Sequence, residues 1–262
     1  MIDKIVRFDD GAAYERMMGI WSRRVGEDFL DWLNLPTGLK CLDVGCGNGA
    51  FTELLVERCR PAEVQGVDRS PQQIEFARKR HSAKIAEFRQ GDAMALPFPD
   101  NRFDAAIMAL VIFFVPEPAQ GVAEMARVVR PGGVVAAYAW DMEGGGFPMT
   151  PILAEVRALG KETQGPPSVE ASRMDSLRKL WSDACVEALE TCKITVQRTF
   201  ADFENLWTAS TGAGSVRATV EALSPSEAEA LKTRLRATFP ADAEGRITQS
   251  GFANAIKGRV RK

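Results

Sequence analysis

The sequence is poor in the residues that build metal sites, disulfide frameworks and histidine-based catalytic centres. Its 262 residues include one histidine, His81, and five cysteines that form no Cys-x-x-Cys pair. A lone histidine argues against imidazole-rich zinc sites and Ser-His-Asp triads. The odd number of cysteines argues against a disulfide framework, so we expect reduced thiols, no metal and a cytoplasmic protein. The cysteines are Cys41, Cys46, Cys59, Cys185 and Cys192.

Long apolar runs and an excess of positive charge are also missing. No stretch approaches the roughly 18 consecutive apolar residues that a membrane span requires. Residues 1–7 place charges where a secretory signal would need an apolar core. The formal net charge is -2, and no dense block of lysine and arginine is present. We therefore expect neither a membrane nor a nucleic acid as a partner, whereas the oligomeric state has no signature in the sequence.

Short apolar runs alternate with amphipathic stretches between residues 40 and 140. Strands are predicted at residues 41–44, 64–68, 86–90, 103–109 and 134–140. Helices are predicted at residues 50–59, 70–80 and 119–129, the second with Ser70 as its N-cap and Pro71 in its first turn. Strands that alternate with helices pair in parallel through right-handed crossovers. The pattern therefore predicts an α/β, Rossmann-like, doubly wound and mostly parallel sheet.

The segments on either side of this core are less regular. Residues 12–33 carry apolar side chains at three- and four-residue spacing, as an amphipathic helix does. After residue 140 we expect helices at 151–160, 173–184 and 224–239, and strands at 188–200 and 252–260. The last two strands bring the sheet to seven, with a helical insertion before them. One domain is predicted over residues 1–262, divided into a helical lid (1–35), a cofactor-binding core (36–141), a helical insertion or cap (142–184) and a C-terminal part that completes the sheet (185–262).

The first predicted strand ends in a glycine-rich turn that leads into a helix. Glycines allow a tight turn and a close approach of backbone to ligand, and the helix N-terminus adds unpaired N–H groups. Gly45, Gly47 and Ala50 also satisfy the dinucleotide pattern G-x-G-x-x-G/A. Asp68 lies about 20 residues further on, where either kind of cofactor needs a carboxylate for its ribose hydroxyls. These residues predict a nucleotide-type cofactor and leave its identity open.

Four segments, in a fixed order along the chain, indicate which cofactor is expected. Residues 42–49 read LDVGCGNG, with Asp43 two positions before the first glycine, and residues 66–71 read GVDRSP. Residues 91–98 read GDAMALPF, and residues 103–133 run from a predicted strand to a Pro-Gly-Gly turn. Together they resemble the motifs of class I S-adenosylmethionine-dependent methyltransferases, and most closely the methyltransferase type 11 group. The resemblance covers about residues 40–140.

This resemblance implies S-adenosylmethionine as the cofactor and S-adenosylhomocysteine as the product that remains after methyl transfer. Asp68 would hold the ribose hydroxyls, Asp92 and the backbone after it would face the adenine, and the end of the fourth strand would flank the cofactor. The residues that the resemblance assigns to cofactor binding in the core are Asp43, Gly45, Cys46, Gly47, Asp68, Arg69, Ser70, Gly91, Asp92, Ala93, Ala109, Leu110 and Phe114.

Residues 14–23 resemble the leading helix that lies across the cofactor as a lid in many such enzymes. Tyr14, Met18 and Trp21 would then cover the methionine end of the cofactor or shape the substrate pocket. Tyr14 is the strongest of the three candidates, because its hydroxyl can bond the ligand carboxylate or a neighbouring acid. For Met18 and Trp21 the alternative is ordinary packing in the core.

The expected reaction is methyl transfer to a small-molecule acceptor by in-line displacement, because the sulfonium already makes the methyl group electrophilic. No residue is singled out by its spacing as a general base, so the catalytic residues stay unknown. Two alternatives remain, an NAD-dependent oxidoreductase and a non-catalytic module that binds S-adenosylmethionine. Against the first, the Tyr-x-x-x-Lys pair of short-chain dehydrogenases is absent, since Met18 and Met142 lie four residues after the only two tyrosines.

Overall fold

A computed structural model describes residues 18–161, 165–212 and 214–261. Its seven strands form one sheet in the order β3-β2-β1-β4-β5-β7-β6. The pairs among β1 to β5 are parallel, and β7 runs antiparallel to both of its neighbours. This arrangement confirms the predicted α/β, mostly parallel, seven-stranded sheet. The strands are β1 (Lys40–Val44), β2 (Glu63–Asp68), β3 (Ala86–Gln90), β4 (Phe103–Ala109), β5 (Val129–Trp140), β6 (Val186–Phe200) and β7 (Ile247–Val260).

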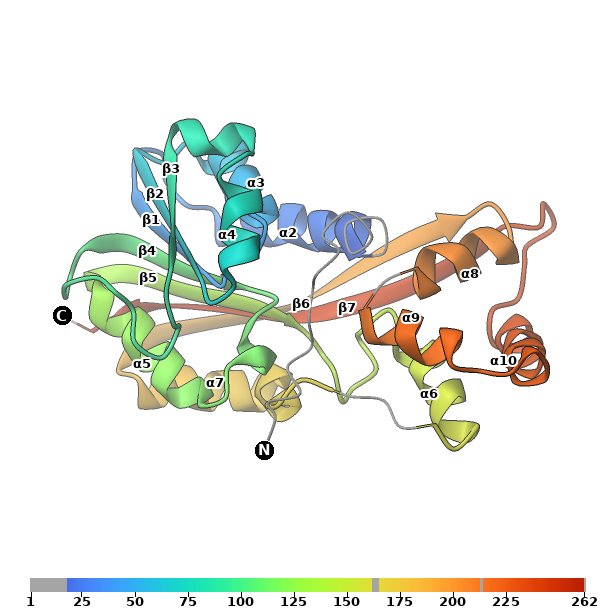
Figure 1. The fold of residues 1–262 in the computed structure, drawn as a ribbon. Coiled ribbons are helices and arrows are strands. Elements are labelled where there is room, and N and C mark those ends of the chain that lie inside the picture. Colours follow the sequence, from blue (N-terminus) through green and yellow to red (C-terminus); the bar gives the residue numbers. More distant parts are fainter. Residues whose placement is uncertain (1–17, 162–164, 213, 262) are drawn as a thin grey trace.

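Helices cover both faces of the parallel part of the sheet (Figure 1). The helices α2 (Ile20–Leu33), α3 (Ala50–Cys59) and α4 (Pro71–Ala77) lie on one face. The helices α5 (Pro118–Val128) and α7 (Met174–Asp183) lie on the other. Among the described residues, none of the helices is long and apolar enough to cross a membrane. Three short 3-10 helices complete this part, η2 (His81–Lys84), η3 (Ile112–Phe114) and η4 (Val169–Ser172).

An aromatic cluster fixes α2 against the sheet. The ring of Phe29 lies 4.5 Å from that of Tyr138 on β5 and 6.3 Å from that of Phe51 on α3. Val25 and Trp21, one and two turns earlier in α2, are also fully buried. The three- and four-residue spacing of these side chains is what the sequence pattern indicated. The cluster thus ties the first described helix to the strand beside the carboxyl end of β4.

The antiparallel strands β6 and β7 extend beyond the parallel ones as a two-stranded ribbon. Strand β5 pairs with β7 only as far as Trp140 and Ala253, whereas β6 continues to pair with β7 as far as Phe200 and Ile247. Four helices gather around this extension (Figure 1): α6 (Thr150–Ala158), α8 (Phe203–Thr211), α9 (Gly214–Glu221) and α10 (Pro225–Thr238). They form a helical group apart from the parallel sheet.

The structure divides the predicted cap differently from the sequence. Within 142–184 only α6 belongs to the distal helical group, because α7 packs on the sheet, where Trp181 Nε1 donates to the Val135 carbonyl at 2.9 Å. The other distal helices, α8, α9 and α10, lie between β6 and β7 in the sequence. Of these three, only α10 was predicted. Helix α8 begins at a side-chain cap, since Asp202 accepts from the backbone N–H of Asn205 at 2.7 Å. The predicted helix over residues 12–33 is described from Ile20 onward, and residues 12–17 lie outside the described residues.

Candidate cofactor-binding site

The three glycines of the turn between β1 and α3 differ in the space around them. All three glycines have positive φ, 76° at Gly45, 51° at Gly47 and 80° at Gly49. A Cβ on Gly45 would lie 2.5 Å from Val111 Cγ1, and one on Gly49 would lie 3.1 Å from the Cβ of Ala77. A Cβ on Gly47 would meet no atom of the described residues within 4 Å. Gly45 and Gly49 therefore serve packing, and Gly47 leaves the backbone open to a ligand.

Asp68 lies beside this open position at the end of β2. Its Oδ2 accepts from the Gly47 N–H at 2.9 Å, and its Oδ1 accepts from the Ser70 N–H at 2.8 Å. The N–H groups of Gly45 and Cys46 both donate to the Val67 carbonyl, at 2.7 and 3.0 Å. The two loops are thus held together, and each oxygen of a carboxylate keeps a further lone pair for a ligand hydroxyl. This is the placement that the ribose assignment requires.

The loop after β3 continues the same edge of the sheet. The Gly91 N–H donates to the Asp68 carbonyl at 3.0 Å, and Arg69 Nε lies 3.7 Å from Asp92 Oδ2. Asp92 Oδ1 accepts from the Met94 N–H at 2.9 Å, which holds Ala93 in a tight turn. The predicted residues of the second and third motifs therefore lie together, joined by the Gly91–Asp68 hydrogen bond and by the approach of Arg69 to Asp92.

The end of β4 reaches the glycine turn through a left-handed residue. Leu110 has a φ of 60°, and its N–H donates to the Tyr138 carbonyl at 2.8 Å. Such a conformation costs a residue other than glycine roughly 1–3 kcal/mol, so its surroundings must hold it in place. The chain then bends so that Val111 fills the space beside Gly45. Ala109 and Leu110 are partly buried, as is Phe114, whose ring lies 4.7 Å from that of Phe113.

Asp43 lies beneath the turn and is fully buried. Its Oδ2 accepts from the Thr52 hydroxyl at 2.5 Å, and its Oδ1 has no hydrogen-bond partner among the described residues. Burial raises the pKa of Asp43 to about 7, helped by the charge of Asp68 and opposed by the Thr52 hydrogen bond. Burial also raises the pKa of the Cys46 thiol, so that thiol stays protonated at neutral pH and acts as a small filler.

Arg80 supports the turn from the segment after α4, although no sequence motif singles it out. Its Nε donates to the Asn48 carbonyl at 2.7 Å, and its Nη1 lies 2.9 Å from Glu53 Oε2 in the first turn of α3. Thr52 was missed as well, although a hydroxyl in the first turn after a strand-end acid is a recognisable pattern. Both residues act on the turn through its backbone or through Asp43.

The predicted lid residues are only partly described. Tyr14 lies outside the described residues. Met18 and Trp21 are both buried, with 2% and 0% of their surface exposed, and both belong to the hydrophobic core. The indole N–H of Trp21 has no hydrogen-bond partner among the described residues. Their placement agrees with core packing, and their contact with a cofactor stays a prediction.

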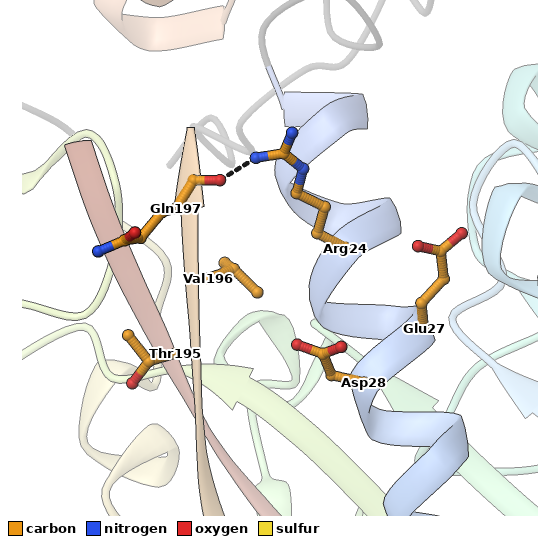
Figure 2. A pocket seen from close by; sticks show the side chains of 6 residues that line it. All are labelled: Arg24, Glu27, Asp28, Thr195, Val196 and Gln197. Carbon is orange, nitrogen blue, oxygen red and sulfur yellow. Dashed lines mark hydrogen bonds between the residues drawn. The ribbon is translucent and has the colours of Figure 1, made fainter. Parts of the chain in front are cut away.

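A cavity of about 480 Å³ lies between α2 and the edge strand β6 (Figure 2). In it, the Arg24 guanidinium donates to the backbone carbonyl of Gln197. No predicted cofactor residue lines this cavity, so we do not assign the cofactor to it. Over the described part of the chain, no group of three or more His, Cys, Asp or Glu side chains is arranged to hold a metal ion. The lining residues are Arg24, Glu27, Asp28, Thr195, Val196 and Gln197.

The residues around the glycine turn fit S-adenosylmethionine. Gly47 offers an open backbone position, Asp68 offers a carboxylate beside it, and Asp43 is a buried acid beneath it with one oxygen that has no partner among the described residues. A cofactor with ribose hydroxyls and positive charge suits such a site, because hydroxyls donate to carboxylates and a cation balances a buried acid.

Comparison with known proteins identifies the core. Residues 42–137 match the family model described as a methyltransferase domain. The chain is 43% identical over 96 residues to a fatty-acid O-methyltransferase of Mycolicibacterium smegmatis, an alignment that covers 37% of this chain and 35% of that protein. It is 34% identical over 142 residues to a demethylmenaquinone methyltransferase of Staphylococcus aureus, covering 53% of this chain and 55% of that protein. The chain thus spans between a third and about half of these relatives' length.

Solved structures share the fold over nearly the whole chain. The phosphoethanolamine N-methyltransferase 2 of Haemonchus contortus, in complex with phosphomonomethylethanolamine and S-adenosylhomocysteine, superposes with a TM-score of 0.58 at 15% identity, covering 95% of this chain and 57% of that one. The cyclase SpnF superposes with a TM-score of 0.56 at 20% identity, covering 92% of this chain and 81% of that one. At such identities these structures show the fold alone.

The sequence comparisons, together with the order of the four motifs around the turn, favour S-adenosylmethionine over the dinucleotide that the glycines alone would also allow. The chain therefore carries a methyltransferase domain of the class I S-adenosylmethionine-dependent family.

Proposed function

We propose that this protein transfers the methyl group of S-adenosylmethionine to a small-molecule acceptor. The observation that carries the proposal is the junction of Gly47 and Asp68, where an open backbone position lies 2.9 Å from a strand-end carboxylate inside a matched methyltransferase domain. Asp68 also accepts from the Ser70 N–H, so hydrogen bonds to the backbone orient the carboxylate toward Gly47 and reduce the ordering that cofactor binding would cost.

In the proposed reaction the chain mainly binds, orients and excludes water. Asp68 would accept from the ribose hydroxyls, and Asp92 with Ala93 would face the adenine. Ala109, Leu110 and Phe114 would flank the reactive end with apolar surface, which keeps water from the acceptor. The bound cofactor supplies an electrophilic methyl group, so alignment of an already nucleophilic acceptor is enough for transfer.

We further propose that the acceptor has an apolar body. The segment that follows β5 contains Met142 and Phe147, and the short helix η3 after β4 contains Phe114; all three side chains are partly buried. Apolar walls with few polar groups are typical of small-molecule sites. The names of the fatty-acid and demethylmenaquinone methyltransferases support the same class, because both denote molecules with long apolar parts. The acceptor would lie between α2 and the segment after β5, of which the structure describes residues 142–161.

A turnover assay tests this function against the alternative of a non-catalytic binding module. Purified protein would be incubated with S-adenosylmethionine labelled in its methyl group and with a panel of fatty acids, quinols, small amines and short oligonucleotides. We expect label in an apolar small molecule. Label only in an amine or an oligonucleotide would contradict the acceptor class. Cofactor binding without label in any class would favour the non-catalytic module.

A further inference from the structure

The Asn48 carbonyl of the glycine turn has a charged partner from outside the turn. Arg80, three residues after the end of α4, donates from its Nε to this carbonyl at 2.7 Å. Its Nη1 lies 2.9 Å from Oε2 of Glu53 in the first turn of α3, and the two side chains are only 20% and 23% exposed. A hydrogen bond from a charged donor that is largely shielded from water is among the stronger polar contacts in a protein.

The stem of the Arg80 side chain also packs against the turn. A Cβ on Gly49 would lie 3.1 Å from the Cβ of Ala77 and 3.3 Å from the Cδ of Arg80. Gly49 has a φ of 80°, so both its backbone conformation and this close approach favour a glycine. The end of α4 and the residues that follow it therefore lie directly against the turn whose carbonyl Arg80 holds.

The segment at the other end of α4 holds the neighbouring residue of the turn. Asp68 precedes α4, and its two oxygens accept from the Gly47 N–H at 2.9 Å and from the N–H of the N-cap residue Ser70 at 2.8 Å. The Asn48 side chain is engaged as well, because its Oδ1 accepts from the Ala50 N–H at 3.1 Å. The Gly47 N–H and the Asn48 carbonyl are thus held from the two ends of one short helix.

We propose that Arg80 is a positioning residue for the cofactor, because it keeps the glycine turn in the conformation that leaves the Gly47 position open. Arg80 acts through the Asn48 carbonyl and needs no contact with the cofactor. The turn requires such support because Gly47 and Gly49 have φ values of 51° and 80°, and glycines lose much conformational freedom when they are fixed. Without this bond fewer molecules hold the turn ready, and the apparent affinity falls with that fraction. The inference rests on the proposed function, which places the cofactor at Gly47.

Arg80→Met and Arg80→Lys test the polar contacts separately from the packing of the stem. Methionine keeps an unbranched apolar chain against Gly49 and removes both polar contacts, whereas lysine keeps a positively charged donor. We expect Arg80→Met to weaken S-adenosylhomocysteine binding by roughly 5- to 30-fold in calorimetry, as the loss of a charged hydrogen bond that supports the turn would. Arg80→Lys should recover most of that loss.

Arg102→Met is the matched control. Arg102 forms a similarly shielded ion pair with Glu63, and these side chains are 31% and 28% exposed. Glu63 begins β2 and Arg102 immediately precedes β4, so the pair lies at the amino ends of these parallel strands, whereas the glycine turn follows the carboxyl end of β1. Arg102→Met should lower stability in urea to a similar extent and leave the affinity for S-adenosylhomocysteine unchanged.

Hydrogen exchange measured by mass spectrometry locates the loosened segment. In the ligand-free protein, Arg80→Met should exchange faster in peptides that cover residues 44–50, and Arg102→Met should not. Saturating S-adenosylhomocysteine should restore the protection. If Arg80→Met fails to fold, Glu53→Gln decides, because it keeps the Nε bond but removes the charge that orients Arg80. Glu53→Gln should weaken binding by a smaller factor, about 2- to 5-fold.

The outcomes also separate this inference from the proposed function. Failure of the wild-type protein to bind S-adenosylhomocysteine would overturn the proposed function itself. Binding by the wild type with an unchanged affinity in Arg80→Met, or with an equal loss in Arg102→Met, would overturn the role of Arg80 and leave the proposed function standing. An Arg80→Lys variant that binds no better than Arg80→Met, or an unchanged affinity in Glu53→Gln, would likewise contradict it.

Discussion

Gly47→Ala is the substitution that most directly separates ligand approach from backbone strain in the glycine turn. Gly47 has a φ of 51°, so an alanine there costs roughly 1–2 kcal/mol of folding stability through its left-handed backbone. Its Cβ would meet none of the described residues within 4 Å, so no packing clash adds to that cost. The methyl group would instead enter the space that we propose for the cofactor.

Gly38→Ala is the matched control. Gly38 has a φ of 80°, and a Cβ there also meets no described residue within 4 Å, but it lies before β1, at the other end of the strand from the turn. Both variants should therefore lose similar stability in urea unfolding. Only Gly47→Ala should weaken S-adenosylhomocysteine binding, by about 1–3 kcal/mol for a lost backbone contact, which is roughly 5- to 150-fold. Equal affinities of the two variants in calorimetry would refute the assignment of Gly47 as the open backbone position.

Three further predictions concern single side chains. Asp68→Ala should weaken S-adenosylhomocysteine binding by about 1.5–3 kcal/mol, measured by calorimetry, and an unchanged affinity would show that the ribose assignment is wrong. Trp181→Phe should lower the free energy of unfolding by about 1–3 kcal/mol in urea, because the Val135 carbonyl loses its buried donor; no loss would contradict this contact. Because the folded-state pKa of Asp43 is raised to about 7 from an ordinary value near 3.8, the folded state binds the extra proton, and ligand-free stability should fall by a few kcal/mol as pH rises from about 4 to 7. Unfolding curves of Asp43→Asn should lack that part of the pH dependence.

Most of the parallel sheet follows from local sequence, because its signals are strong and short in range. The predicted ranges for α3, β3 and β4 coincide with the structure. Strand β5 starts five residues earlier than predicted, at Val129, because Val129 pairs with Phe103; the Pro-Gly-Gly stretch that follows forms an irregularity in the strand before pairing resumes at Val134 and Ala105.

The distal helices were harder to place, because amphipathic spacing does not say which surface a helix covers. Helix α7 has the same kind of pattern as a cap helix, yet it packs on the sheet through Trp181. Helices α8 and α9 went unpredicted, although Asp202 has the side chain of an N-cap and an apolar spacing follows it in Phe203 and Leu206. The capping box of Ser224 and Glu227 made α10 easier to find.

Some features of the candidate site were likewise predictable from the sequence, and others depend on the fold. Glycine spacing and the acid at the end of β2 predicted the turn and Asp68, which the structure brings within hydrogen-bond distance. The packing of Val111 against Gly45 and the burial of Asp43 depend on contacts between separate strands and loops. One-dimensional spacing carries no information about such contacts, so the protonation behaviour of Asp43 emerges only from the fold.

The proposed function depends on binding of S-adenosylmethionine at the glycine turn beside Asp68. Titration of the purified protein with S-adenosylhomocysteine and, separately, with NADH in a calorimeter measures this binding. We predict saturable binding of S-adenosylhomocysteine at one site and no binding of NADH. Tight binding of NADH without binding of S-adenosylhomocysteine would show that the turn holds a dinucleotide.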